Sequence, residues 1–189
     1  MNGTSPRAVR SREKLLRAAT DLLVEAGPRG VTVDAVAEVS GVAKSTLYRQ
    51  WGSRDEMLVD VVRCNMPEPG DADLSGGFET ALRSYMAAGA VALADPEWSR
   101  ILPALLSLRT SMPELAAVVD ADRSTKRVVL QSIIALGVAE AALPEAIDID
   151  DATILLFGPL VFATITDQQH RLDHLAGYAT DRFIQSYRP

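Results

Sequence analysis

The sequence predicts an all-α protein. Alanine and leucine are frequent, whereas aromatic residues make up only 5% of the 189 residues, and this composition favours helices over sheet. No stretch shows the period-two alternation of a half-buried strand, and no internal repeat is visible. The clearest helical pattern lies near the start of the chain, where apolar residues recur at helical spacing: Leu15, Leu16, Ala19, Leu22, Leu23 and Ala26.

An N-terminal domain is predicted over residues 1–64. It begins with a basic arm, residues 1–10, which we expect to be mobile, and continues with a helix that starts at Ser11. Gly27-Pro28 stops this helix, because glycine and proline both disfavour helix interiors.

A linker and a helical C-terminal domain complete the predicted organisation. Residues 65–77 hold two prolines and three glycines and are predicted to be the linker. In the domain of residues 78–189, Pro103 and Pro159 fall inside apolar helical patterns and are expected to kink them. The helices expected in this domain cover about residues 78–94, 97–110, 113–141, 150–168 and 173–187.

Residues 32–58 show the pattern of two short helices joined by a tight turn and followed by a third helix. Val36 and Ala37 belong to the buried face of the first helix. Gly41 can adopt the left-handed conformation that the turn needs, and Leu47 is expected to fill the angle between the two helices. This is the packing of a helix-turn-helix.

The second helix of this pair is rich in side chains that can donate hydrogen bonds, as a helix that enters the DNA major groove requires. The alternative is an ordinary helical core with a solvated face. A third helix begins with a capping box, in which Ser53 is the N-cap and Glu56 reaches back to it. The donors of the second helix are Lys44, Ser45, Thr46, Tyr48, Arg49 and Gln50.

Several short motifs follow one another in this region: residues 22–27, Thr32, Val36-Ala37, Gly41-Val42, Ser45-Thr46-Leu47-Tyr48, Trp51 and residues 53–58. In this order they resemble the DNA-binding region of the tetracycline-repressor (TetR) family of bacterial transcription regulators. The resemblance extends over residues 11–64, about a third of the chain. Three positions depart conservatively from the family pattern, with Trp51 for phenylalanine, Arg54 for lysine and Met57 for leucine.

The resemblance implies how this region would meet double-stranded DNA. A two-fold dimer would place two recognition helices in successive major grooves, where the six donors named above would face bases, with Tyr48 close to bases or backbone. An arginine or glutamine that grips one base is worth roughly 1–3 kcal/mol of discrimination, so Arg49→Ala should relax the preference at one position. Arg54→Ala should instead weaken binding to all sequences alike. The phosphate contacts implied by the resemblance are Arg10, Arg12, Thr32, Trp51 and Arg54.

The net charge of −6 is unevenly distributed along the chain. Residues 1–64 carry 10 Lys/Arg and 8 Asp/Glu, a net charge of +2, whereas residues 65–189 carry 9 and 17, a net charge of −8. Attraction to phosphates depends on local patches rather than on total charge, so the overall acidity does not exclude DNA. The basic residues that crowd the start are Arg7, Arg10, Arg12, Lys14 and Arg17.

In the resembling family, the C-terminal region binds a small molecule and forms the dimer. The bulky apolar residues of this region are accompanied by few charges, so we expect an apolar effector. For each of them, the alternative is a side chain of the packed core. The candidate pocket residues are Tyr85, Met86, Trp98, Leu102, Leu105, Leu106, Met112 and Phe157.

The last two predicted helices form the candidate dimer surface. Residues 152–166 are apolar nearly all round, as expected for a helix buried on both sides, and residues 174–187 are more amphipathic. Two copies would form a four-helix bundle across the two-fold axis. The alternative is that the penultimate helix is the centre of a monomer core. The residues expected at the seam are Gly158, Phe162, Ile165, Tyr178 and Phe183.

No cofactor, metal or enzymatic activity is expected. His170 and His174 lie four residues apart, but two lone histidines are usually surface residues. The chain has no phosphate-cradling glycine loop and no nucleophile–base set. Cys64 is the single cysteine, which fits a reducing cytoplasm. We see no signal peptide and no apolar run that could span a membrane.

These features together predict a ligand-responsive transcriptional regulator. It would be a repressor that binds a palindromic operator as a homodimer and is released by a small, mostly apolar molecule. One alternative is an activator, or a regulator that answers a protein partner. A remote alternative is a helical enzyme or scaffold that uses its helix-turn-helix for protein contacts.

Overall fold

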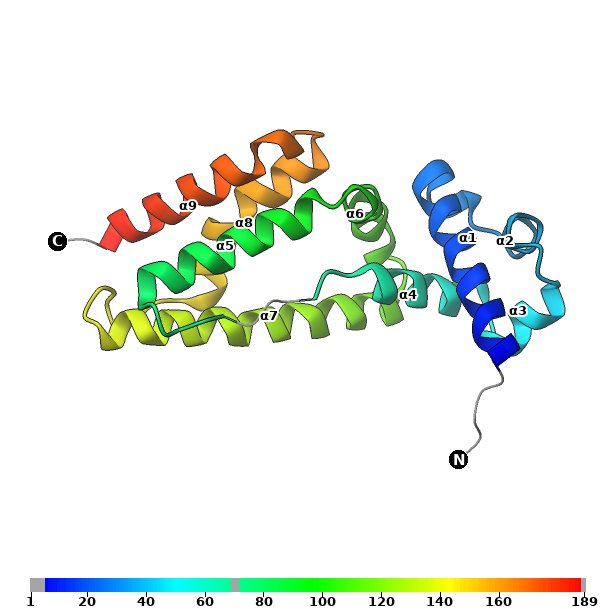
Figure 1. Cartoon of the computed structure of the whole chain (residues 1–189), viewed down its shortest axis with the longest axis horizontal. Helices are drawn as coiled ribbons and strands as arrows, with labels where there is room; N and C mark the ends of the chain where they lie inside the picture. The colour runs from blue at the N-terminus through cyan, green and yellow to red at the C-terminus, as the bar shows by residue number, and fades with distance from the viewer. Residues whose placement is uncertain (1–5, 69–71, 188–189) are drawn as a thin grey trace, which may run out of the picture. The chain divides into compact units, whose positions relative to one another are not determined.

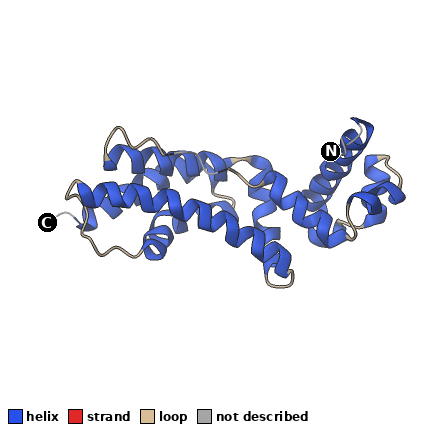
Figure 2. Cartoon of the chain, turned by 90° about the horizontal axis from the view of Figure 1, so that it is seen from below, coloured by secondary structure: helices blue, strands red, loops and turns tan. Residues whose placement is uncertain are grey.

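The computed structural model describes residues 6–68 and 72–187 (Figure 1). Within these ranges every regular element is a helix and no strand is present, as Figure 2 shows. The predicted all-α fold is therefore confirmed. None of the helices in the described ranges is long and apolar enough to cross a membrane.

Internal contacts divide the chain into two compact units. The first boundary, after residue 66, lies close to the predicted end of the N-terminal domain at residue 64. The units differ from the predicted domains in residues 100–118, which group with the first unit and not with the rest of the C-terminal region. The first unit comprises residues 1–66 and 100–118, and the second comprises residues 67–99 and 119–189. Two helices contribute to both units: α6 (Pro96–Arg109) and α7 (Pro113–Ala139).

Helix α1 (Pro6–Gly30) begins earlier than the sequence predicted. Residues 6–10 of the expected arm are helical, because proline is favoured at the first helical position and no helix breaker follows it. The remaining arm residues, 1–5, lie outside the described residues. The predicted break is present at Gly27, whose φ of 68° and ψ of −174° are not helical.

The helix-turn-helix consists of α2 (Val33–Ser40) and α3 (Lys44–Gln50). Thr32 caps α2, since its hydroxyl oxygen accepts the N–H of the third helical residue at 3.1 Å. Gly41 ends α2 with a φ of 65° and a ψ of 20°, the left-handed conformation that glycine adopts without steric cost. Leu47 is fully buried, so α3 is fixed to the domain by its inward face.

Helix α4 (Arg54–Asn65) carries the predicted capping box with one difference. The Ser53 hydroxyl oxygen accepts the N–H of Glu56 at 3.1 Å, as expected. The Glu56 carboxylate accepts the N–H of Gly52 at 2.9 Å, one residue before the expected partner. Both bonds satisfy donors at the junction of α3 and α4, and so fix the angle at which α4 leaves the helix-turn-helix.

The second unit is built on α5 (Phe78–Ala94), α8 (Ile149–Ile165) and α9 (Leu172–Tyr187), which pack side by side (Figure 1). A short 3₁₀ helix, η1 (Gln169–Arg171), joins α8 to α9. The C-terminal part of α7 closes the same core. Fully or nearly fully buried core residues include Phe78, Leu82, Met86, Leu130, Ile133, Leu156, Leu160 and Phe183.

The first turn of α5 is capped from a distant part of the chain. Gly77 precedes the helix and has no side chain to act as a cap. The carboxylate of Glu140, just after α7, takes this role and accepts the N–H of Phe78 at 3.1 and 3.3 Å. This contact joins the end of α7 to the start of α5 and favours a negative charge at a helix N-terminus.

We expect Glu140→Ala to lower the stability of the protein by about 1 kcal/mol, the usual value of an N-cap, and Tm by about 2–4 °C. Thermal unfolding followed by circular dichroism measures the change. Glu140→Gln keeps an acceptor oxygen and should lose less. Glu145→Ala removes an exposed glutamate from the same loop and should leave Tm unchanged. Equal losses for Glu140→Ala and Glu145→Ala would show that the cap has no particular role.

Candidate nucleic-acid interface

Helix α3 has one buried and one exposed side. Leu47 is fully buried, whereas Tyr48 is 56% exposed. The remaining predicted base-contacting residues divide into two groups: Lys44, Ser45 and Arg49 are exposed, and Thr46 and Gln50 are partly buried. All six polar side chains therefore remain accessible on a helix that is anchored from beneath.

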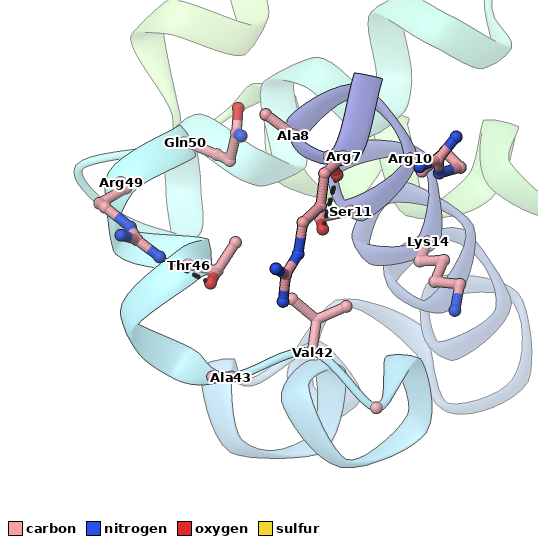
Figure 3. Close-up of a pocket in the computed structure, with 11 residues that line it drawn as sticks. Arg7, Ala8, Arg10, Ser11, Lys14, Val42, Ala43, Thr46, Arg49 and Gln50 are labelled. Carbon is pink, nitrogen blue, oxygen red and sulfur yellow. Dashed lines mark hydrogen bonds between the residues drawn. The ribbon is translucent and has the colours of Figure 1, made fainter. Parts of the chain in front are cut away.

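A groove of about 880 Å³ lies between α3 and the N-terminal part of α1 (Figure 3). Its lining contains four basic side chains and no carboxylate. Figure 3 shows Arg7 extending from α1 towards the turn at Val42. The residues that line the groove are Arg7, Ala8, Arg10, Ser11, Lys14, Gly41, Val42, Ala43, Thr46, Arg49 and Gln50. We call this surface the basic groove.

The basic groove contains two cations that the sequence analysis did not assign to DNA, Arg7 and Lys14, together with Arg10, which it did. Because α1 starts at Pro6, residues 7, 10, 11 and 14 fall on one face of the helix. The same spacing would have been visible in the sequence if residues 6–10 had been expected to be helical. A concave surface lined by cations concentrates positive potential, which suits a phosphate backbone.

Arg54, a predicted phosphate contact, has its donors engaged within the first unit. Its Nε donates to the carbonyl oxygen of Val31 at 2.5 Å, and its Nη2 donates to the carbonyl oxygen of Pro28. Its Nη1 lies 2.8 Å from a carboxylate oxygen of Asp55. The planar guanidinium thus ties α4 to the segment between α1 and α2, a structural role that a sequence comparison cannot distinguish from phosphate binding.

Trp51 and Arg12, two further predicted phosphate contacts, share an internal partner. The indole Nε1 of Trp51 donates to a carboxylate oxygen of Asp60 at 2.7 Å, and Arg12 pairs with the same oxygen. The Arg12 guanidinium lies 5.3 Å from the centre of the Trp51 ring. Trp51 is only 5% exposed, and so it packs inside the domain, where Asp60 satisfies its single donor.

Two of the predicted base contacts also have partners on the surface. Lys44 Nζ lies 2.6 Å from Asp34 Oδ1, and both side chains are more than half exposed, so the pair contributes little and is easily exchanged. Arg49 Nη2 donates to the hydroxyl oxygen of Thr46 at 3.0 Å. Thr32 is exposed, and its oxygen serves as the cap of α2.

The predicted pocket residues are divided between the two units. Tyr85, Met86, Trp98 and Phe157 belong to the second unit, and Leu102, Leu105, Leu106 and Met112 belong to the first. Most are buried, but Phe157 is partly buried and Leu106 is 46% exposed.

In the second unit, the Tyr85 and Phe157 rings meet edge to face with their centres 5.5 Å apart. The Phe157 ring also covers Gly89, where an added Cβ would lie 2.6 Å from it. The Tyr85 hydroxyl donates to the carbonyl oxygen of Lys126 at 3.2 Å. Burial, helped by the charge of Asp122, raises the pKa of Tyr85 to about 12, so this phenol is a neutral donor at neutral pH.

The predicted seam residues lie at different depths. Phe162 is 61% exposed, Tyr178 is 51% exposed, and nothing lies within 4 Å of a Cβ added at Gly158. Ile165 is 40% exposed. Phe183 differs, because it is 4% exposed and packs in the core of its own chain, edge to face with Tyr187. It therefore supports α9 from within and does not belong to the exposed face.

The two histidines do not form a metal site with neighbouring residues. His174 stacks on the ring of Tyr178, with 6.1 Å between centres. In the two described ranges, no group of three or more His, Cys, Asp or Glu is placed to hold a metal ion.

An exposed recognition helix beside a basic groove is the arrangement of a helix-turn-helix protein that binds DNA and regulates transcription. Residues 15–61 match the family described as bacterial regulatory proteins, tetR family, and residues 73–182 match the tetracyclin repressor-like C-terminal domain. The chain belongs to the tetR family, and the resemblance stated from its motifs is confirmed. Members of this family are non-enzymatic DNA-binding regulators, as predicted.

Individual proteins resemble the chain to different extents. An uncharacterised HTH-type transcriptional regulator of Bacillus subtilis (strain 168), YdeS, is 40% identical over 55 residues, which cover 29% of this chain and 28% of that protein. A regulator from Rhodococcus sp. Rha1 has a similar structure, with a TM-score of 0.75, 21% identity and coverage of 94% of this chain and 97% of that one.

Two other structures have titles that concern small molecules. The flavonoid-responsive regulator FrrA has a TM-score of 0.71 and 19% identity, and the match covers 96% of this chain and 98% of that one. FadR from Bacillus subtilis in complex with stearoyl-CoA has a TM-score of 0.69 and 19% identity, with coverage of 93% and 99%. At these identities, the likeness concerns the fold alone.

Proposed function

We propose that the protein is a ligand-responsive repressor in the cytoplasm. It binds a palindromic operator as a homodimer and is released by a small, mostly apolar molecule. The observation that supports the DNA-binding part most strongly is the basic groove, because four cations without a carboxylate lie directly beside the exposed donors of α3.

In this proposal, the two walls of the groove have different roles. Arg49 and Gln50 on α3 read bases, with arginine suited to guanine O6 and N7 and glutamine suited to adenine N6 and N7. Arg7, Arg10 and Lys14 on α1 hold phosphates and so set the register of α3 in the major groove. Lys44, Ser45 and Tyr48 complete the surface that faces the duplex.

The homodimer is supported by an apolar face on α8. Its exposed side chains recur along one side of the helix, and an exposed tyrosine of the neighbouring α9 adds to them. A second copy would remove this apolar area from water, and it would also supply a second seven-residue recognition helix. The residues of this face, with their exposed fractions, are Ile154 (62%), Leu155 (61%), Phe162 (61%), Ile165 (40%) and Tyr178 (51%).

The effector is proposed from chemistry and from relatives. FadR is described in complex with stearoyl-CoA and FrrA as flavonoid-responsive, so structurally similar proteins respond to molecules with large apolar parts. Tyr85 and Phe157 offer aromatic faces in the second unit of this chain. A ligand that fits one arrangement of the helices better than another would shift the protein towards it, by no more than its difference in affinity for the two.

Selection of bound oligonucleotides from a random pool tests this function, followed by sedimentation of the free protein. We expect an enriched palindrome and a mass of about twice the 20.3 kDa chain. Phe162→Arg should give a monomer, because it places a charge on the apolar face, and it should weaken operator binding. Leu74→Arg, at an exposed leucine outside α8 and α9, is the matched control and should remain dimeric. A wild-type monomer at micromolar concentration, or no enriched sequence, would contradict the proposal.

A further inference from the structure

We propose that Thr46 is a specificity-positioning residue that acts through Arg49. Its hydroxyl oxygen holds the Arg49 guanidinium in the orientation in which it reads a guanine. This role rests on the proposed function, since it concerns how the recognition helix discriminates between bases. The sequence analysis assigned Thr46 to a base contact of its own.

The geometry that supports this role is a bond along one face of α3. Thr46 and Arg49 are three residues apart, which places them one above the other on a helix, and the Nη2–Oγ1 distance is 3.0 Å (Figure 3). Both residues line the basic groove. The hydroxyl takes one of the five N–H groups of the guanidinium, so enough remain for the two bonds that a guanine accepts.

The two partners differ in how firmly they are held. Arg49 is exposed, with a long side chain that loses considerable rotamer freedom when it is fixed. Thr46 is partly buried, is branched at Cβ, and precedes Leu47, which is fully buried. A stiff residue on an anchored helix can therefore fix a mobile one before DNA arrives, and this lowers the entropic cost of the base contact.

The other basic residue of α3 is held differently. Lys44 pairs with Asp34 of α2, outside the groove lining, and its ammonium is a point charge without a fork. Arg49 thus combines a planar set of donors with a neighbour that orients it. This combination predicts that discrimination at one base pair depends on two residues, of which only one touches the base.

Measurements on the selected operator and its point-substituted forms test the proposal. Thr46→Val keeps the shape of the side chain but removes the hydroxyl, and it should reduce discrimination about three- to tenfold at the base pair that Arg49→Ala affects, and at no other. Thr46→Ser should restore the wild-type value. In the double variant, Thr46→Val should add nothing to Arg49→Ala, because the hydroxyl acts only through the guanidinium.

The control variant is Ser45→Ala, which removes a neighbouring hydroxyl from the same helix and should leave that base pair unaffected. Side-chain ¹⁵N relaxation of Arg49 in the free protein gives a second measurement, in which Thr46→Val should increase the motion of the guanidinium and Thr46→Ser should not. Additive losses in the double variant, unchanged discrimination in Thr46→Val, or unchanged Arg49 motion would each overturn the proposal. These results require a wild-type protein that selects an operator. If the wild type selects none, the proposed function itself fails.

Discussion

Replacing Arg7, Arg10 and Lys14 together by glutamine is expected to weaken operator binding and to flatten its salt dependence. Each phosphate contact that is lost lowers the slope of log K against log salt by about 0.9, so three contacts change it by roughly 2.7. Between about 50 and 200 mM salt, the affinity of the wild type should therefore fall roughly 40-fold more than that of the variant. Fluorescence anisotropy with a labelled operator measures both slopes.

The physical reason is the composition of the basic groove. Its cations belong to α1, and no carboxylate in the lining offsets them. Because these side chains would hold the backbone and not the bases, the order of preference among operator variants should stay the same.

A matched variant removes the same number of charges from the same unit. Arg17, Arg29 and Arg100 lie outside the groove lining, and their joint replacement by glutamine changes the net charge equally. We expect a much smaller change in slope for this variant. Equal slopes in the two triple variants would mean that total charge, rather than the groove, governs the attraction.

Arg54→Ala is expected to destabilise the protein by about 2–3 kcal/mol while leaving the salt slope of DNA binding unchanged. Hydrogen bonds that involve a charged group contribute about 1.5–3 kcal/mol each, and the partly exposed position of Arg54 reduces their sum. The variant leaves the carbonyl oxygens of Val31 and Pro28 without their partner. Urea unfolding followed by circular dichroism measures the loss.

Two further variants make this prediction specific. Arg54→Lys keeps the charge but has a single ammonium, which cannot reproduce the planar geometry of both bonds, so its stability should be intermediate. Asp55→Ala removes only the exposed ion pair of Arg54 and should change stability by less than about 1 kcal/mol. An Arg54→Ala protein with wild-type stability and a flattened salt slope would restore the assignment of Arg54 to a phosphate.

The candidate site was predictable from the sequence in part. The order of Gly41, Leu47 and the donors between them predicts a helix-turn-helix, because the turn and the plug are local requirements of its packing. The basic groove was not predictable, since it needs both the start of α1 at Pro6 and the approach of α1 to α3. Arg7 and Lys14 were visible as part of a basic cluster but could not be assigned to a surface.

By itself, the sequence determined the all-α class, the position of most helices, the helix-turn-helix and the family, because these depend on helical periodicity, caps and local turns. Only the tertiary structure decided the roles of individual polar side chains. Arg54 and Trp51 have the residue types of phosphate contacts, yet the structure gives them partners at Val31, Pro28 and Asp60 within the domain. A long polar side chain can reach solvent or a neighbour equally well, and which one it meets depends on residues that are distant in the sequence and close in the fold.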